Sequence, residues 1–258
     1  MLHHKTYGEG PPLVILHGLF GMLDNWQTLA RRWAERYRVV LADLRNHGRS
    51  PHQSDMDYPL MAADVAELLE HLGIDRCVLI GHSMGGKVAM QAALNYPELV
   101  ERLVVVDIAP RRYEPGHRTI FAALDAFDPG AVSSRKEATA AMNAFVSDPG
   151  IQLFLLKNLA RAPEGGFRWR MNLEGIRAAY PALIGPVGNV GDQYDGPALF
   201  VRGGASGYVR DDDLSFIRIL FPGAELATVP GAGHWVHAER PEELMAVVDA
   251  FLRPASLS

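Results

Sequence analysis

The sequence has one cysteine among its 258 residues, Cys77, so it can form neither an internal disulfide nor a zinc site built on a Cys-x-x-Cys pair. Cys77 lies in an apolar segment, which predicts a buried strand residue rather than a nucleophile. Runs of like charge are also missing: 25 Lys and Arg stand against 30 Asp and Glu, a formal charge of −5. This balance disfavours a surface for nucleic acid or for an anionic membrane.

Long apolar runs are absent as well. No segment approaches the roughly 18 residues that a membrane span requires, and the start of the chain, residues 1–5, lacks the apolar region of a secretory signal. We therefore expect a cytoplasmic protein without an integral membrane segment. Hydrophobic residues make up 48% and charged residues 21% of the chain, which indicates a folded globular protein with a sizeable core.

Strand and helix signals alternate at both ends of the sequence, a pattern typical of a mostly parallel sheet with helices on both faces. Between residues 111 and 190 helical segments predominate, with a turn and a short extended piece near 165–170. We therefore expect an α/β fold with a core formed by residues 1–110 and 191–258 and an inserted helical cap at 111–190. The expected strands are 12–16, 38–42, 76–80, 103–106, 198–202 and 225–229, and the expected helices are 24–37, 61–72, 87–95, 119–126, 135–145, 152–160, 212–221 and 241–252.

The strongest chemical signal is Gly81-His82-Ser83-Met84-Gly85. It fits the G-x-S-x-G nucleophile elbow, in which a strained turn between a strand and a helix exposes a serine hydroxyl. The motif lies between an expected strand and an expected helix, so we predict that Ser83 is a nucleophile. The alternative, a glycine-rich loop that binds phosphate, lacks the glycine spacing of the usual nucleotide-binding motifs.

A serine hydroxyl needs a base to take its proton. His234 follows the last expected strand, at the sheet edge where Ser83 is expected, and is therefore the predicted base. His237 is expected to pack against or cap the final helix, and His17 to shape the loop in which it lies. The other histidines that the sequence leaves without a catalytic context are His3, His4, His52, His71 and His117.

The base requires a carboxylate that orients it, and this should also follow a strand. Asp107 ends the strand expected at 103–106 and is our choice. The alternatives are the run 211–213, which is better placed to begin a helix, and Asp43, which is expected to bond within its own loop.

Backbone donors must stabilise the oxyanion of the reaction. The N–H of Met84, directly after the nucleophile, is one predicted donor, and the N–H of Leu19 is the second, with Phe20 as the next choice. The residues expected to line the substrate pocket, in loops at the same sheet edge, are Phe20, His82, Tyr208 and Trp235. The sequence indicates no metal site and no cofactor.

These motifs occur in the order His17-Gly18, Asp43 to Ser50, Gly81 to Gly86 and Gly233-His234, and together they resemble the α/β-hydrolase superfamily. The segments 17–25, 106–110 and 231–239 are more narrowly similar to the YbfF-type esterases, relatives of the mammalian ABHD11-like proteins. This resemblance implies hydrolysis of short acyl esters and acyl-CoA thioesters under a helical cap. In many α/β-hydrolases the acid of the serine–histidine–acid triad lies at a position that corresponds to about Ser206 in this sequence. In the YbfF-type pattern this acid corresponds to Asp107.

The sequence therefore predicts a serine carboxylesterase that acts on a small-molecule ester or thioester. The alternatives are a C–C bond hydrolase or menaquinone-pathway lyase of the same fold, and a ligand-binding protein without turnover. Arg111, Arg112 and Arg118 form either a site for a CoA phosphate or carboxylate or a solvated basic patch. Neither the physiological substrate nor the oligomeric state can be read from the sequence.

Overall fold

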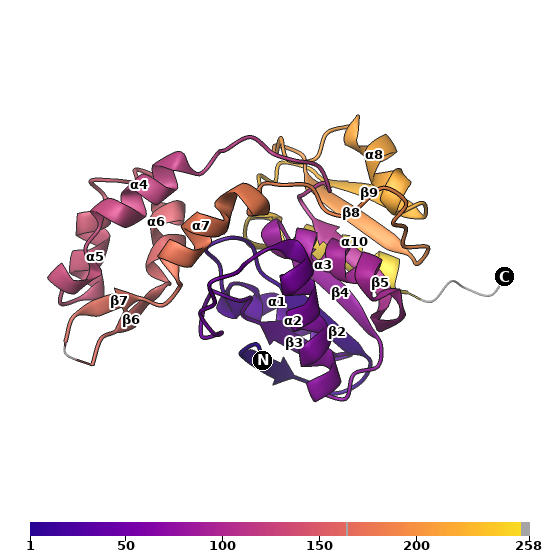
Figure 1. Ribbon diagram of the computed structural model, residues 1–258, viewed down its shortest axis with the longest axis horizontal. Helices are drawn as coiled ribbons and strands as arrows, with labels where there is room; N and C mark the ends of the chain where they lie inside the picture. Colours follow the sequence, from indigo (N-terminus) through magenta and orange to yellow (C-terminus); the bar gives the residue numbers. More distant parts are fainter. Residues whose placement is uncertain (164, 254–258) are drawn as a thin grey trace.

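The computed structural model describes residues 1–163 and 165–253 and contains a seven-stranded sheet (Figure 1). The strand order is β1-β3-β2-β4-β5-β8-β9, and every strand runs parallel to its neighbours except β1, which pairs antiparallel with β3. The strands are β1 (His4–Tyr7), β2 (Pro12–Leu16), β3 (Arg38–Ala42), β4 (Cys77–His82), β5 (Val100–Val106), β8 (Ala198–Gly203) and β9 (Ala224–Val229).

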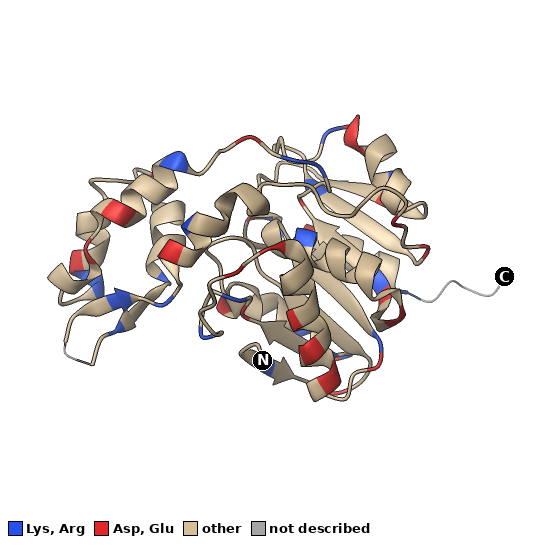
Figure 2. Cartoon of the chain, in the orientation of Figure 1, with Lys and Arg blue, Asp and Glu red and all other residues tan. Residues whose placement is uncertain are grey.

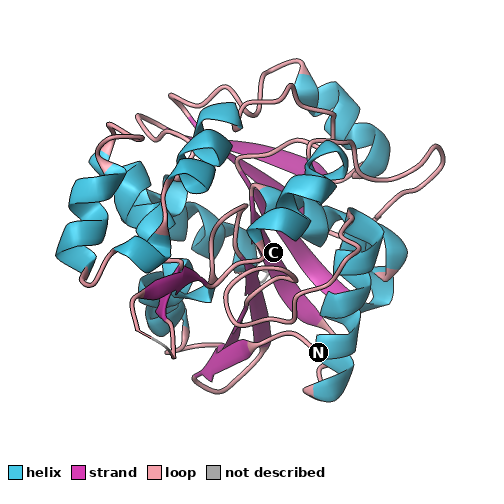
Figure 3. Cartoon of the chain, turned by 60° about the vertical axis from the view of Figure 1, so that its left-hand side comes forward, coloured by secondary structure: helices cyan, strands magenta, loops and turns pink. Residues whose placement is uncertain are grey.

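Helices cover both faces of this sheet (Figure 3). Alternate residues of each inner strand enter different apolar clusters: Cys77 and Leu79 of β4 join one, and Val78 and Ile80 join the other. Burial on both faces explains why the inner strands are continuously apolar. One face is covered by α2 (Tyr58–His71), α3 (Met84–Asn95) and α8 (Asp213–Leu220), and the other by η1 (Leu23–Trp26), α1 (Gln27–Trp33), α9 (Val236–Glu239) and α10 (Pro241–Leu252).

No described element between residues 111 and 190 joins the large sheet. Figure 1 shows these elements gathered beside the core. Where the chain leaves and re-enters the core, Tyr113 N–H donates to the Ile184 carbonyl at 2.8 Å and Val187 N–H to the Pro110 carbonyl at 2.9 Å. The elements are α4 (Arg118–Ala126), η3 (Pro129–Ala131), α5 (Arg135–Met142), α6 (Pro149–Leu156), the antiparallel hairpin β6 (Leu159–Arg161) and β7 (Phe167–Trp169), and α7 (Leu173–Leu183).

The expected α/β-hydrolase architecture is confirmed, and the strands at 12–16 and 38–42 and the helix at 241–252 have the predicted bounds. The helix expected at 24–37 is wrong, because η1 precedes α1 and α1 ends at Trp33. The helix expected at 152–160 is also wrong at its end, because Leu159–Arg161 pairs with β7. Such pairing depends on the partner strand Phe167–Trp169 and is not visible in the apolar periodicity of residues 152–160. The sequence analysis also missed β1, η2 (Pro97–Leu99), α7 and α9. Residue 164 of the expected cap and residues 254–258 of the expected core lie outside the described residues.

Acidic and basic residues are interspersed over both parts of the molecule (Figure 2). This distribution agrees with the absence of charge runs in the sequence. Within the described ranges, no helix combines the length and the apolar character needed to cross a membrane.

Candidate active site

Ser83, Asp107 and His234 come together at the carboxyl edge of the sheet. Ser83 follows β4, Asp107 follows the adjacent strand β5, and His234 lies in the loop after β9. His234 Nε2 is 3.0 Å from Ser83 Oγ, and His234 Nδ1 is 2.8 Å from Asp107 Oδ2. When Nδ1–H donates to the carboxylate, Nε2 is left to accept the serine proton. The three side chains thus form one continuous hydrogen-bonded line.

The turn at Ser83 is strained in the way that a nucleophile elbow requires. Ser83 has φ 52° and ψ −119°, a conformation that L-residues rarely adopt. The flanking glycines permit the turn: a Cβ on Gly81 would lie 2.1 Å from the Gly85 carbonyl oxygen, and a Cβ on Gly85 would lie 2.5 Å from the His17 carbonyl oxygen. Both distances are far below van der Waals contact, so larger residues at these positions would push the strand and the helix apart.

Asp107 is held by three donors in a fully buried position. Its Oδ1 accepts the Gly203 N–H at 2.9 Å, and its Oδ2 accepts the Ser206 hydroxyl at 2.5 Å as well as His234. These bonds exist because β5 and β8 are neighbours in the sheet. The sequence analysis assigned no role to Ser206, whereas the structure gives it a direct hydrogen bond to the carboxylate.

Three of the four other carboxylates that the sequence offered, Asp43, Asp211 and Asp213, are engaged elsewhere. Asp43 accepts the N–H groups of Leu23 and Arg49, both at 2.8 Å. Asp211 pairs with Arg202 at 2.7 Å, and Asp213 pairs with Arg111 at 2.8 Å. In the part of the chain that the structure describes, Asp107 is the carboxylate bonded to His234.

The predicted oxyanion donors lie beside Ser83. Leu19 and Met84 line the same cavity as the serine, and within the described residues neither N–H has a hydrogen-bond acceptor. The next choice, the Phe20 N–H, is unavailable because it donates to His47 Nε2 at 3.2 Å. Phe20 has φ 60°, so the loop turns sharply directly after Leu19.

All four residues expected to line the pocket border a cavity beside Ser83, and Phe20, Tyr208 and Trp235 each contact another aromatic ring there. Phe20 packs edge-on against Phe121, with ring centroids 5.3 Å apart. Tyr208 stacks on the His234 imidazole at 3.8 Å, and Trp235 lies 5.5 Å from the Phe154 ring. Stacking on one face of His234 limits rotation of the imidazole.

His82 also contacts the backbone of His234. Its side chain is buried, and its Nε2 donates to the His234 carbonyl at 2.8 Å. Burial lowers the pKa of His82 well below the ordinary value, with smaller effects from His237 and His234, so the ring stays neutral. Although His82 borders a cavity, its main contact is with the backbone of the base. The His82 side chain thus holds the loop that carries His234. This contact joins segments that are far apart in the sequence, so it could not be read from the sequence alone.

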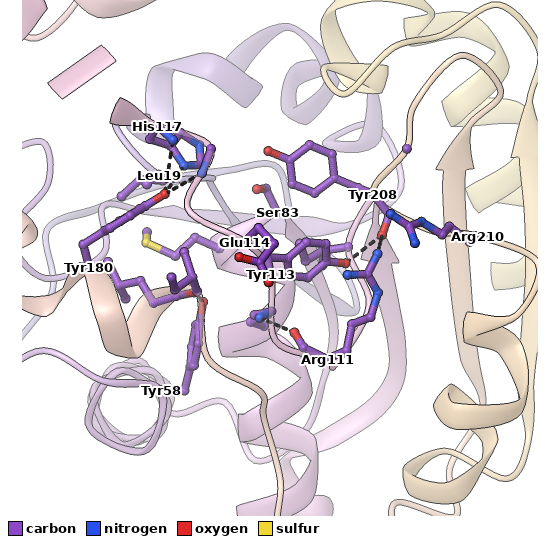
Figure 4. Close-up of a pocket in the computed structure, with 17 residues that line it drawn as sticks. Leu19, Tyr58, Ser83, Arg111, Tyr113, Glu114, His117, Tyr180, Tyr208 and Arg210 are labelled. Carbon is purple, nitrogen blue, oxygen red and sulfur yellow. Dashed lines mark hydrogen bonds between the residues drawn. The ribbon is translucent and has the colours of Figure 1, made fainter. Parts of the chain in front are cut away.

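Two cavities meet at Ser83. The first, of about 320 Å³, is shown in Figure 4, and the second has about 370 Å³. Leu19, Ser83, His117 and Tyr208 border both. Residues that line only the first cavity include Met84, Lys87, Arg111, Tyr113 and Tyr180. Residues that line only the second cavity include Phe20, His82, Phe154, His234 and Trp235.

Lys87 also lines the first cavity, although it was not among the pocket residues predicted from the sequence. A signal for it exists, because Lys87 is the one charged residue in the twelve-residue helix α3 and follows Ser83 by a single helical turn. As for metals, the described residues contain no cluster of three or more His, Cys, Asp or Glu that could hold an ion.

Comparison with known proteins places this site in a family. The model of the alpha/beta hydrolase fold matches residues 11–143, about half of the chain. The mouse sn-1-specific diacylglycerol lipase ABHD11 is 45% identical over 94% of this chain and 81% of its own length. The Escherichia coli esterase YbfF is 37% identical over 93% of this chain and 92% of its own length. Among solved structures, a marine microorganism esterase has 39% identity and a TM-score of 0.94, covering 97% of this chain and 99% of its own.

The matches to the two relatives and to the solved structure extend over nearly the whole chain, including the segment between residues 111 and 190. The chain therefore belongs to the α/β-hydrolase family, among the relatives of ABHD11 and YbfF, and is a carboxylic ester hydrolase.

Proposed function

We propose that this chain hydrolyses short-chain carboxylic esters through an acyl-enzyme formed on Ser83. The observation that carries the proposal is the hydrogen-bonded line from Ser83 Oγ through His234 to Asp107, at 3.0 and 2.8 Å. A serine, a base and an orienting acid in this arrangement are the minimum that acyl transfer to a hydroxyl requires.

In the proposed mechanism Ser83 Oγ attacks the ester carbonyl carbon while His234 Nε2 takes the hydroxyl proton. Asp107 holds the imidazole in the correct orientation and stabilises its charged form. The N–H groups of Leu19 and Met84 donate to the oxyanion of the tetrahedral intermediate. His234 then returns the proton to the leaving alkoxide, and a water molecule cleaves the acyl-enzyme by the same steps.

The proton donor defines which cavity takes which part of the ester. His234 must protonate the leaving oxygen, and His234 borders the second cavity, so the alcohol occupies that side. The acyl group then occupies the first cavity, whose volume of about 320 Å³ is near the lower end for ligand pockets. This size favours short acyl chains. The same chemistry extends to short acyl thioesters, in which a thiol leaves on the His234 side.

We also propose that residues 111–190 act as a cap over this site. Tyr113, His117 and Tyr180 from this segment line the first cavity opposite Ser83 and Met84 from the core. Phe154 and Leu155 contribute in the same way to the second cavity. Acyl and alcohol groups would thus be enclosed between the two parts of the chain.

The proposal can be tested with a fluorophosphonate probe and a substrate panel. Peptide mass spectrometry should find the probe on Ser83, and the labelled enzyme should lose activity on p-nitrophenyl esters. Before labelling, rates measured from acetate to palmitate should be highest for short chains, and a matched set of acyl-CoA thioesters should follow the same order. Labelling at another residue, or equal rates before and after labelling, would contradict the mechanism.

Changing Asp107 to asparagine should lower kcat by about 10²- to 10⁴-fold, because an amide in this position favours the wrong imidazole tautomer. Steady-state kinetics on p-nitrophenyl butyrate would measure the loss, and circular dichroism would confirm that the fold persists. The matched control is Asp211→Asn, the same chemical change at a side chain that is 88% exposed. Loss of activity in the Asp211 variant with normal activity in the Asp107 variant would show that the acid assignment is wrong.

A further inference from the structure

The floor of the first cavity contains a buried cation, Lys87. This residue is 1% exposed, and its Nζ donates to the carbonyls of Arg111, at 2.8 Å, and Gly185. The rings of Tyr58 and Tyr113 lie 5.5 and 4.8 Å from Nζ. An ammonium group has three donors, so two carbonyl acceptors leave one N–H for another partner.

Lys87 has no anionic partner among the described residues, since no carboxylate of these residues lies within 4 Å of Lys87 Nζ. A buried charge without a counter-ion is energetically costly. Burial, with smaller effects of Arg111 and Arg112, accordingly lowers the pKa of Lys87 to about 7. An anion that entered the cavity would compensate this cost by pairing with the ammonium group.

The other charged groups of the cavity also favour an anion. Arg111 and Arg210 line it together with Lys87, as Figure 4 shows for the two arginines. Asp213 pairs with Arg111 and accepts the Arg210 N–H, both at 2.8 Å, but does not line the cavity. Glu114 is the carboxylate among the described lining residues, and it is exposed to solvent. The lining is therefore cationic in a chain whose net charge is −5.

The position of Lys87 limits the length of the ligand. Ser83 is the N-cap of α3 and Lys87 follows it by four residues, which corresponds to about 6 Å of rise along a helix. Both residues therefore belong to the start of α3 and line one cavity, so an acyl group with two or three methylene groups is the length that we expect to bring its far end from Ser83 to the ammonium.

We propose that Lys87 binds the carboxylate at the far end of a short dicarboxylic acyl group, so that half-esters of succinic or glutaric acid are preferred substrates. The proposal rests on the proposed function in one respect, the assignment of the first cavity to the acyl group. Lys87 also connects the two ends of the segment 111–190 through Arg111 and Gly185, so a test must separate recognition of charge from a structural role.

The test compares monomethyl succinate with methyl succinamate, its neutral amide counterpart of the same shape, by pH-stat titration at pH 7. We expect kcat/KM of the wild type to be roughly 10- to 100-fold higher for the charged ester, the size of a charge-assisted hydrogen bond. Lys87→Met should remove this preference, because kcat/KM should fall roughly 10- to 100-fold more for the charged ester than for the amide, and Lys87→Arg should retain part of it. The matched control, Lys136→Met, loses an exposed lysine of α5 and should keep the preference.

A wild-type preference for the neutral ester, or no preference, would overturn the proposal whether or not the variants fold. Equal losses on both esters in Lys87→Met would also overturn it and would assign Lys87 a purely structural role. Failure on both esters with normal hydrolysis of p-nitrophenyl butyrate refutes the dicarboxylic preference but leaves the proposed function intact. Calorimetry of succinate binding to the Ser83→Ala variant tests the proposed carboxylate site without turnover. Binding that is lost when Lys87→Met is added supports the proposal, and the absence of binding to Ser83→Ala counts against the proposal.

Discussion

Replacing Ser83 by alanine should reduce ester hydrolysis by about 10⁶-fold in kcat, the scale seen when the nucleophile of a serine hydrolase is removed. The alanine methyl group cannot form the acyl-enzyme, and His234 Nε2 loses the hydroxyl that lies 3.0 Å away. Because the variant keeps the cavities and both predicted oxyanion donors, substrate binding should persist. Steady-state rates on p-nitrophenyl butyrate and binding of a non-hydrolysed amide analogue would measure the two effects separately.

The matched control for this variant is Ser215→Ala, the same change on the exposed side of α8. It should have wild-type kinetics, and both variants should have a melting temperature close to that of the wild type. If Ser83→Ala retained activity within tenfold of the wild type, attack by Ser83 would be refuted, and ester cleavage would have to proceed through another nucleophile.

Acid should unfold this protein well above the pH at which its carboxylates are protonated. Burial lowers the pKa of His17 to about 4 and that of His47 to about 3, and it holds the pKa of His82 well below the ordinary value of 6.5. The folded state therefore keeps these rings neutral at pH 5, whereas the unfolded chain binds a proton at each. The unfolded state is favoured progressively as the pH falls from about 6.5 towards 4.

The expected effect is large. Burial also lowers the pKa of His237, to about 3. Each of these four buried histidines contributes up to about 1.4 kcal/mol per pH unit in this window, so together they give about 5 kcal/mol per unit. A typical domain has only about 5–15 kcal/mol of stability. Urea titrations followed by circular dichroism between pH 7 and 4.5 should show the free energy of unfolding fall with about this slope.

The variant that tests this interpretation is His47→Gln, which removes one of the buried titrating groups. It should reduce the slope by about one quarter, whatever its effect on stability at pH 7. The matched control, His71→Gln, changes an exposed histidine near the end of α2 and should leave the slope unchanged. A wild-type stability that is flat between pH 6.5 and 4.5 would contradict the prediction.

The elements that the sequence predicts well are those whose signal is local. The strand at 12–16 is a short apolar run, and the helix at 241–252 begins with Pro241 at a position that favours helix initiation. The hairpin of β6 and β7 was harder to predict, because Leu159–Arg161 continues the apolar pattern of α6 and becomes a strand only by pairing with Phe167–Trp169. The end of an element cannot be read from apolar periodicity when it is set by pairing with another strand.

In the candidate site, too, some features are predictable from local sequence and others depend on the tertiary structure. Ser83 and His234 were accessible from the sequence because each follows a predicted strand in a motif with a chemical rationale. Asp107 could be chosen over residues 211–213 because it ends a strand and they begin a helix. The hydrogen bond from Ser206 to Asp107 was not accessible, since it depends on β8 lying beside β5 and on the turn of the loop after β8.

By itself, the sequence determined the α/β class, the position of the glycine-flanked Ser83 between a strand and a helix, and the order of the candidate site residues, because glycine spacing and alternating apolar runs are encoded locally. The tertiary structure decided that His82 donates to the backbone of His234, that the Phe20 N–H is occupied by His47, and that Lys87 is buried in the same cavity as Ser83. These properties arise from burial and from contacts between segments far apart in the chain. Burial and contact distance set hydrogen-bond availability and pKa, and neither is contained in the spacing of residues along the sequence.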